Sequence, residues 1–176
     1  MKKTSKIALC GVLAAVELVV LLAAYFPYLT YALPALAGAF TIPVVIDVGK
    51  KHAWIMFSVV SVLSFFLCEK EAMVFYILFF GHYPIIKSYI EQTKSKPVCL
   101  LIKFICATVC FAIAYYLTTF VMGIDIETVG DFGKYTSIVF LVMYDVVFFV
   151  YDIALTRIVG LYILKFRKQV RKIFYL

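Results

Sequence analysis

Two aspartates lie inside a long apolar run near the C-terminal end of the sequence. The run from Leu141 to Leu164 carries Asp145 and Asp152, which are seven residues apart, and each follows a tyrosine, Tyr144 and Tyr151. Seven residues make close to two turns of an α-helix, so the two carboxylates recur on one side of it. A charged carboxylate in hydrocarbon costs roughly 2.5 to 3.5 kcal/mol on insertion scales. We therefore expect this face to turn toward protein, water or a ligand.

The composition of the chain is that of an integral membrane protein. Its 176 residues are 65% hydrophobic and only 15% charged, and the mean hydropathy is +1.05. A soluble domain of this size could not cover such a chain with polar surface. The length allows about six spans of roughly 20 residues and leaves no room for a soluble catalytic domain. The net charge of +7 does not indicate nucleic-acid binding in such a protein.

The apolar runs predict an all-α, polytopic membrane protein whose single domain, residues 1–176, is a six-helix bundle. Proline, glycine and charged residues mark the ends of the runs. The basic start also fits a signal peptide, but the apolar stretch continues to Phe26 without a cleavage site, so a retained first helix is favoured. A basic tail is expected after Leu164. The expected helices are 7–26, 31–48, 53–67, 72–90, 98–122 and 137–164.

Lysine and arginine are distributed very unequally between the two sets of loops. Fourteen of them lie near span ends on one side, and only Lys70 and Lys134 lie on the other. Positive residues accumulate on the cytoplasmic side of membrane proteins. The six-helix arrangement therefore predicts a multi-pass protein of the cell membrane with both termini in the cytoplasm.

Several charged residues fall inside the predicted spans, where they need partners. At 1.5 Å per residue, each one has a rough depth that can be compared across helices. Three pairs share a depth and could either hold helices together or form a proton or ion relay. The structural role is favoured, because no repeated motif or inverted repeat accompanies the pairs. The pairs are Glu17 with His82, Asp47 with Lys87, and Lys103 with Asp152.

Asp145 has no lysine at its depth, about 12 Å from the outer surface, and only His82 lies within vertical reach. An unpaired carboxylate is expected where water or a polar ligand reaches it. Aromatic residues surround the same outer half. Any one of them could simply face lipid or the membrane interface, but together they could hold a flat heterocycle or a vitamin. The predicted substrate-binding residues are Asp145, Tyr144, Tyr76, Phe80, His82, Tyr115 and Tyr31.

The first helix carries small residues at helical spacing, among them Ala8, Gly11 and Ala15. Small residues three and four positions apart let another helix approach closely. This face therefore either packs inside the bundle or contacts a helix of a partner subunit.

Motifs for catalysis and metal binding are missing from the sequence. The five cysteines form no C-x-x-C pair and lie mostly in apolar runs, as small buried hydrophobes do. Neither H-E-x-x-H nor G-x-S-x-G occurs, so metal hydrolysis and acyl transfer lack their usual residues. We therefore expect no catalytic residue, no metal site and no cofactor, and the chain is not expected to be an enzyme.

The six-span layout is accompanied by four notable stretches, MKKTSKIALCGVLAAV, YALPALAGAFTIPVVIDVGKK, FFGHYPIIKSYIE and YDIALTR. With these features the sequence resembles the substrate-binding S components of energy-coupling factor (ECF) transporters. The resemblance implies a six-helix subunit that binds a vitamin or related micronutrient in an outer-side pocket, roofed by the loop between the first two helices. It also implies a partner transmembrane subunit and two cytoplasmic ATPases, since this chain has no phosphate-binding G-x-x-x-x-G-K-[ST] loop.

The first helix departs from the pattern of that family. An Ala-x-x-x-Ala pattern on this helix contacts the partner in the family, whereas this chain reads Ala8 to Val12 and Gly11 to Ala15. No signature selects one vitamin over another. The alternative function is a membrane scaffold or assembly protein, for example of cell-shape machinery, which would bind no ligand and use its buried charges only to hold helices together.

Overall fold

The computed structural model describes residues 3–26, 29–93, 96–116 and 135–174. Nearly all of these residues are helical, and none of the described residues lies in a strand. The all-α fold class predicted from the apolar runs is therefore confirmed.

Five helical segments are long and apolar enough to cross a membrane. A sixth apolar segment, Ala32–Val48, is shorter, and at 1.5 Å per residue it covers only about 25 Å of a hydrocarbon core roughly 30 Å thick. The six segments correspond to the six predicted helices, so the chain has the make-up of a polytopic membrane protein. The five long segments are Thr4–Tyr25, Lys50–Leu67, Lys70–Ile90, Pro97–Tyr116 and Ile138–Ile173.

The chain divides into two compact units. The first comprises Met1–Tyr89 together with Leu155–Leu176, and the second comprises Ile90–Ala154. The single membrane domain expected for residues 1–176, which would include both units, stays a prediction.

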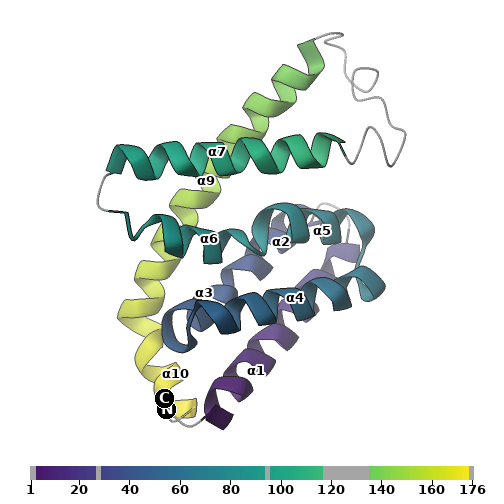
Figure 1. Cartoon of the computed structure of the whole chain (residues 1–176). Coiled ribbons are helices and arrows are strands. Elements are labelled where there is room, and N and C mark those ends of the chain that lie inside the picture. Colours follow the sequence, from purple (N-terminus) through teal and green to yellow (C-terminus); the bar gives the residue numbers. More distant parts are fainter. Residues whose placement is uncertain (1–2, 27–28, 94–95, 117–134, 175–176) are drawn as a thin grey trace. The chain divides into compact units, whose positions relative to one another are not determined.

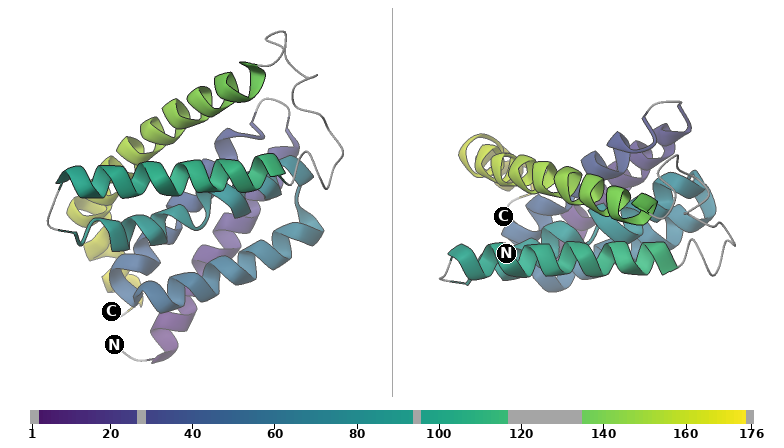
Figure 2. Two further views of the ribbon diagram at one scale, coloured as in Figure 1. Left: turned by 45° about the horizontal axis from the view of Figure 1, so that its top comes forward. Right: turned by 90° about the horizontal axis from the view of Figure 1, so that it is seen from above.

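The first unit is built around its N-terminal helix. Here α1 (Lys3–Leu22) packs against α2 (Ala32–Ala39) and α4 (Lys50–Leu67) (Figure 1, Figure 2). A 3₁₀ turn, η1 (Ala23–Tyr25), ends α1. The apolar side chains between these helices form the core, which includes Leu9, Leu21, Ala37, Val44, Met56 and Val60.

The second predicted helix is broken into three pieces. After α2 come the short α3 (Thr41–Pro43) and a π-helical turn, η2 (Val44–Val48). Gly49 then has φ 118°, a left-handed conformation that only glycine adopts readily. The helix therefore ends there as predicted, but the expected loop over residues 50–52 is wrong, because these residues form the first turn of α4.

The fourth predicted helix is interrupted where the sequence places a glycine and a proline. It consists of α5 (Lys70–Phe75), a π-helical turn η3 (Tyr76–Phe80) and α6 (Tyr83–Ile90). Gly81 follows the π-turn at a close approach, because a Cβ atom there would lie 2.7 Å from Cζ of Tyr76 and 2.8 Å from Cε2 of Phe57. The space that a larger residue would need is taken by the Tyr76 ring.

The C-terminal segment is helical rather than a tail. It contributes η6 (Tyr162–Phe166), a third π-helical turn, and α10 (Arg167–Phe174) to the first unit. The predicted end of the sixth helix at Leu164 is wrong because no proline or glycine follows Gly160, and Val170 of α10 packs against the core of the unit.

The second unit contains α7 (Lys96–Tyr116) and most of α9 (Thr136–Leu161). These two helices carry Lys103, Asp145 and Asp152. The predicted end of the fifth helix, 117–122, and the sequence from there to residue 134 lie outside the described residues.

Candidate functional site

An apolar groove lies along α7 and α9 within the second unit, and we call it the α7–α9 groove. It is an open groove with a volume of about 440 Å³. The hydroxyl groups of one threonine and two tyrosines are the polar side-chain atoms of its lining. The lining residues are Thr108, Phe111, Ala112, Tyr115, Tyr116, Ile138 and Leu141.

Asp145 continues the groove-lining face of α9 by one turn. It lies four residues after Leu141 and seven after Ile138, and residues at these spacings share a helix face. Its Oδ1 atom is buried and has no hydrogen-bond partner among the described residues. A buried acceptor left unpaired costs about 1–3 kcal/mol. A donor supplied by a ligand or a water molecule would remove that cost.

A row of aromatic rings runs beside the groove. The Phe111 ring lies 5.5 Å from that of Tyr144 and 6.5 Å from that of Tyr115, and Tyr144 lies 6.3 Å from Phe148, all measured between centroids. These separations are within the range of favourable aromatic contacts, about 4.5–7 Å. Phe111 therefore links Tyr115 and Tyr144, the two predicted tyrosines of this unit.

Phe111 was not among the predicted site residues. Phe111 lies four residues before Tyr115, so both rings lie on one face of α7. This spacing indicates that the two residues belong to the same site.

The other four predicted site residues belong to the first unit, and two of them lie around Phe75. Tyr31 is exposed, its ring meets the Phe75 ring edge-on at 5.1 Å, and its hydroxyl donates to Glu71 Oε2 over 3.5 Å. Phe80 is buried and stacks on Phe75 at 6.5 Å. That these residues bind substrate stays a prediction.

The remaining two, Tyr76 and His82, make contacts inside the helices. Tyr76 is fully buried, and its hydroxyl donates to Glu17 Oε2 over 2.8 Å. His82 Nδ1 lies 3.1 Å from the carbonyl oxygen of Ile77. Tyr76 therefore points into the core of the unit, and its role in binding also stays a prediction.

Glu17 lies fully buried at the centre of a polar cluster in the first unit. Its Oε1 accepts a hydrogen bond from Thr41 and its Oε2 accepts one from Tyr76, each 2.8 Å long. The predicted pairing of Glu17 with His82 is wrong. Matching depth places two residues at one level, but the rotation of each helix decides which side chains face each other, and the η3 turn presents Tyr76 to α1.

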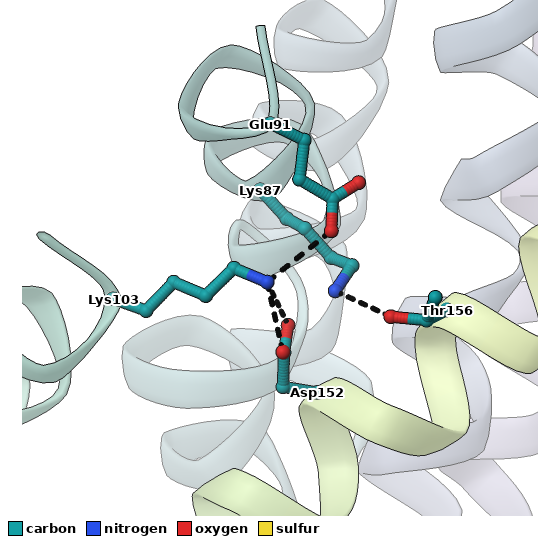
Figure 3. Close-up of polar contacts among 5 residues, drawn as sticks. All are labelled: Lys87, Glu91, Lys103, Asp152 and Thr156. Atoms are coloured by element: carbon teal, nitrogen blue, oxygen red, sulfur yellow. Dashed lines mark hydrogen bonds and ion pairs between the residues drawn. The ribbon is translucent and has the colours of Figure 1, made fainter. Parts of the chain in front are cut away.

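Asp47 has a fully buried side chain that accepts hydrogen bonds from three residues of the first unit. Tyr162 donates to its Oδ2 over 2.5 Å, and Arg167 and Arg171 donate through Nε to Oδ1, each over 3.0 Å. The predicted pairing of Asp47 with Lys87 is wrong because α10 is a helix and brings both arginines to this carboxylate. Lys87 instead donates to Thr156 Oγ1 over 2.9 Å (Figure 3).

The predicted pairing of Lys103 with Asp152 is confirmed. The Lys103 ammonium lies 2.8 Å from Oδ2 and 3.0 Å from Oδ1 of Asp152, and 3.2 Å from Oε1 of Glu91 (Figure 3). The Lys103 and Asp152 side chains are 12% and 13% exposed. Asp152 is therefore neutralised inside the second unit, in contrast to Asp145 two turns away on the same helix.

The small residues of α1 lie on an uncovered face. Ala8, Gly11 and Ala15 are exposed, and no described atom would lie within 4 Å of a Cβ atom added at Gly11. Within the first unit, no described atom fills the space next to Gly11 on this face. Contact with a partner helix stays a prediction.

The chain matches no protein-family model, no curated protein and no solved structure.

Proposed function

We propose that the chain is a membrane-embedded binding subunit for the uptake of a vitamin or similar small micronutrient. The observation that carries this proposal is the unpaired Oδ1 atom of Asp145, which lies one helical turn beyond the α7–α9 groove. Three other carboxylates within apolar helical segments, Glu17, Asp47 and Asp152, accept hydrogen bonds from side chains of the chain itself. Asp145 differs from them in having a buried oxygen with no hydrogen-bond partner among the described residues.

The residues around Asp145 suggest the chemistry of the ligand. The rings of Phe111, Tyr115 and Tyr144 offer a surface on which a flat heterocycle can stack. The carboxylate of Asp145 accepts hydrogen bonds and attracts positive charge. The ligand class that fits both is a ring system carrying an N–H, an O–H or a cationic group.

Uptake would need energy from other proteins. The sequence has no phosphate-binding loop of its own, so ATP hydrolysis is assigned to two ATPase subunits and the coupling to a partner transmembrane subunit. The exposed face of Ala8, Gly11 and Ala15 on α1 is the proposed contact with a partner helix. The chain is placed in the cell membrane with both termini in the cytoplasm, on the basis of its lysine and arginine distribution.

A membrane scaffold without a ligand is the second candidate. The internal pairing of Glu17, Asp47 and Asp152 favours it, since these contacts need no ligand and serve to hold helices together. The two functions differ in whether the chain binds a small molecule.

Native mass spectrometry of the full chain, extracted gently from the membrane of its host, separates the two candidates. A binding subunit should carry a small molecule of constant mass that organic solvent releases, and it should co-purify with larger subunits. A chain that carries only phospholipid after extraction from cells grown in rich medium would favour the scaffold.

A further inference from the structure

Helix α10 carries two pairs of basic residues, each with a spacing of four, and the pairs belong to different faces. Arg167 and Arg171 both donate through Nε to Asp47 Oδ1 over 3.0 Å. Lys168 and Lys172 each follow one position later, about 100° further around the helix, and both are exposed. The arginines therefore face the protein, and the lysines face away from it.

The outward face of α10 and the turn before it combines lysines with apolar side chains. We call this surface, made of Lys165, Phe166, Lys168, Lys172 and Ile173, the outer face. Phe166 is 54% exposed and Ile173 is 68% exposed. None of its three lysines forms an ion pair with a carboxylate among the described residues. The outer face is thus cationic and apolar at once, and nothing in the described chain neutralises it.

The outer face has a fixed orientation. The two arginine contacts to Asp47 hold one side of α10, and Val170 packs against the core of the first unit. Since the helix cannot roll without breaking these contacts, the lysines stay turned away from the protein.

The position of α10 along its helical segment places the outer face near a membrane surface. The segment Ile138–Ile173 has 36 residues, which makes it roughly 54 Å long, whereas the hydrocarbon core is about 30 Å thick. The segment must therefore extend beyond the hydrocarbon. Its basic end, from Lys165 onward, is the part that leaves the hydrocarbon at the least cost.

We propose that the outer face of α10 is a binding surface for anionic phospholipid headgroups. The ammonium groups of Lys165, Lys168 and Lys172 would contact headgroup phosphates, while Phe166 and Ile173 would insert at the boundary with the acyl chains. This combination of cationic and apolar side chains is typical of helices that lie in the membrane interface. A soluble phosphate compound would contact the lysines but would leave Phe166 and Ile173 in water, whereas a phospholipid contacts both kinds of side chain.

The test measures lipid affinity of the full chain in neutral detergent by native mass spectrometry, with phosphatidylglycerol and phosphatidylcholine titrated separately. Each lysine near an anionic surface contributes about five-fold in affinity. The double variant Lys168→Gln/Lys172→Gln should therefore bind phosphatidylglycerol about 25-fold more weakly if the two contributions are independent. Its affinity for phosphatidylcholine should not change.

Two further variants serve as controls. Lys51→Gln/Lys70→Gln removes the same charge from two exposed lysines elsewhere in the first unit. Its affinity for phosphatidylglycerol should stay within about two-fold of the original, because isolated exposed charges contribute little. Lys168→Arg/Lys172→Arg keeps the charge and should restore binding. Equal losses in both Gln variants, or no loss in either, would overturn the proposal. Displacement of phosphatidylglycerol by an equal concentration of inorganic phosphate would overturn it as well, since the surface would then be a site for free phosphate.

Discussion

Tyr162 donates a hydrogen bond of 2.5 Å to Asp47 across 115 positions of the sequence, and each of the two residues belongs to a π-helical turn. Asp47 lies in η2 and Tyr162 in η6. A π-turn adds a residue to the helical turn and changes which side chains face inward, and such turns are frequent at functional sites. Together with the two arginines of α10, this contact joins the C-terminal helices to the η2 turn at one carboxylate.

The first prediction concerns this attachment. Asp47→Asn should destabilise the purified chain by about 1.5–3 kcal/mol, the range for a hydrogen bond to a charged group, because two arginines and a tyrosine lose their anionic acceptor. Thermal unfolding in detergent measures the loss. Arg157→Gln, which removes an exposed charge in the same unit, is the control and should change little. Equal unfolding temperatures for both variants would contradict the role of Asp47.

The second prediction concerns Lys103 and Asp152, which pair at 2.8 Å. Lys103→Gln and Asp152→Asn should each destabilise the second unit more than the double variant does, because each single change leaves one partly buried group without its partner. The expected coupling is roughly 0.5–3 kcal/mol. A double-mutant cycle followed by chemical unfolding measures it. Losses that simply add would show that the pair contributes no coupling.

The third prediction concerns the cluster around Glu17. Tyr76→Phe removes one of two hydrogen bonds to a fully buried carboxyl group and should cost about 1–3 kcal/mol. The matched control is Tyr25→Phe, since the Tyr25 hydroxyl bonds the Leu67 carbonyl oxygen at an exposed position. Thermal unfolding compares the two. The role assigned to Tyr76 is wrong if its variant is no less stable than the control.

The fourth prediction concerns the topology of the membrane segments. In a variant without native cysteines, a cysteine at position 51 should react with a membrane-impermeant maleimide only after the cytoplasmic side is opened. A cysteine at position 70 should react in intact cells, because the lysine and arginine distribution puts it on the outer side. Both positions are exposed; residue 51 lies in the first turn of α4, and residue 70 lies just beyond its last turn. Labelling of both from the same side would refute the six-helix arrangement.

The apolar runs predict the helices, but they do not predict every helix end or every pair of charged side chains. Depth alone found the pairing of Lys103 with Asp152, where both residues lie on regular helices, α7 and α9. It failed for Glu17 and Asp47, because each contact involves a π-helical turn that rotates the following side chains. Depth fixes the level of a residue but not the direction of its side chain.

The sequence does contain a sign that the helix continues beyond Leu164. Arg167 and Arg171 are four residues apart, a spacing that puts both on one face of a helix and could have indicated partners for an inward carboxylate. In the second unit, the predicted Tyr115 and Tyr144 lie on either side of Phe111, so part of the candidate site followed from the sequence while its central ring did not.

The most direct test of the proposed function measures the ligand-bound fraction in native mass spectra of three proteins extracted in the same way. These are the original chain, Asp145→Asn, and the control Glu91→Gln, which makes the same change at an exposed acid of the second unit. A hydrogen bond to a charged group contributes about 1.5–3 kcal/mol, so Asp145→Asn should bind roughly 10- to 150-fold more weakly. The control should keep its ligand, and both variants should unfold at similar temperatures. An Asp145→Asn protein that carries as much ligand as the original chain would contradict the assignment of Asp145 as the ligand-binding carboxylate.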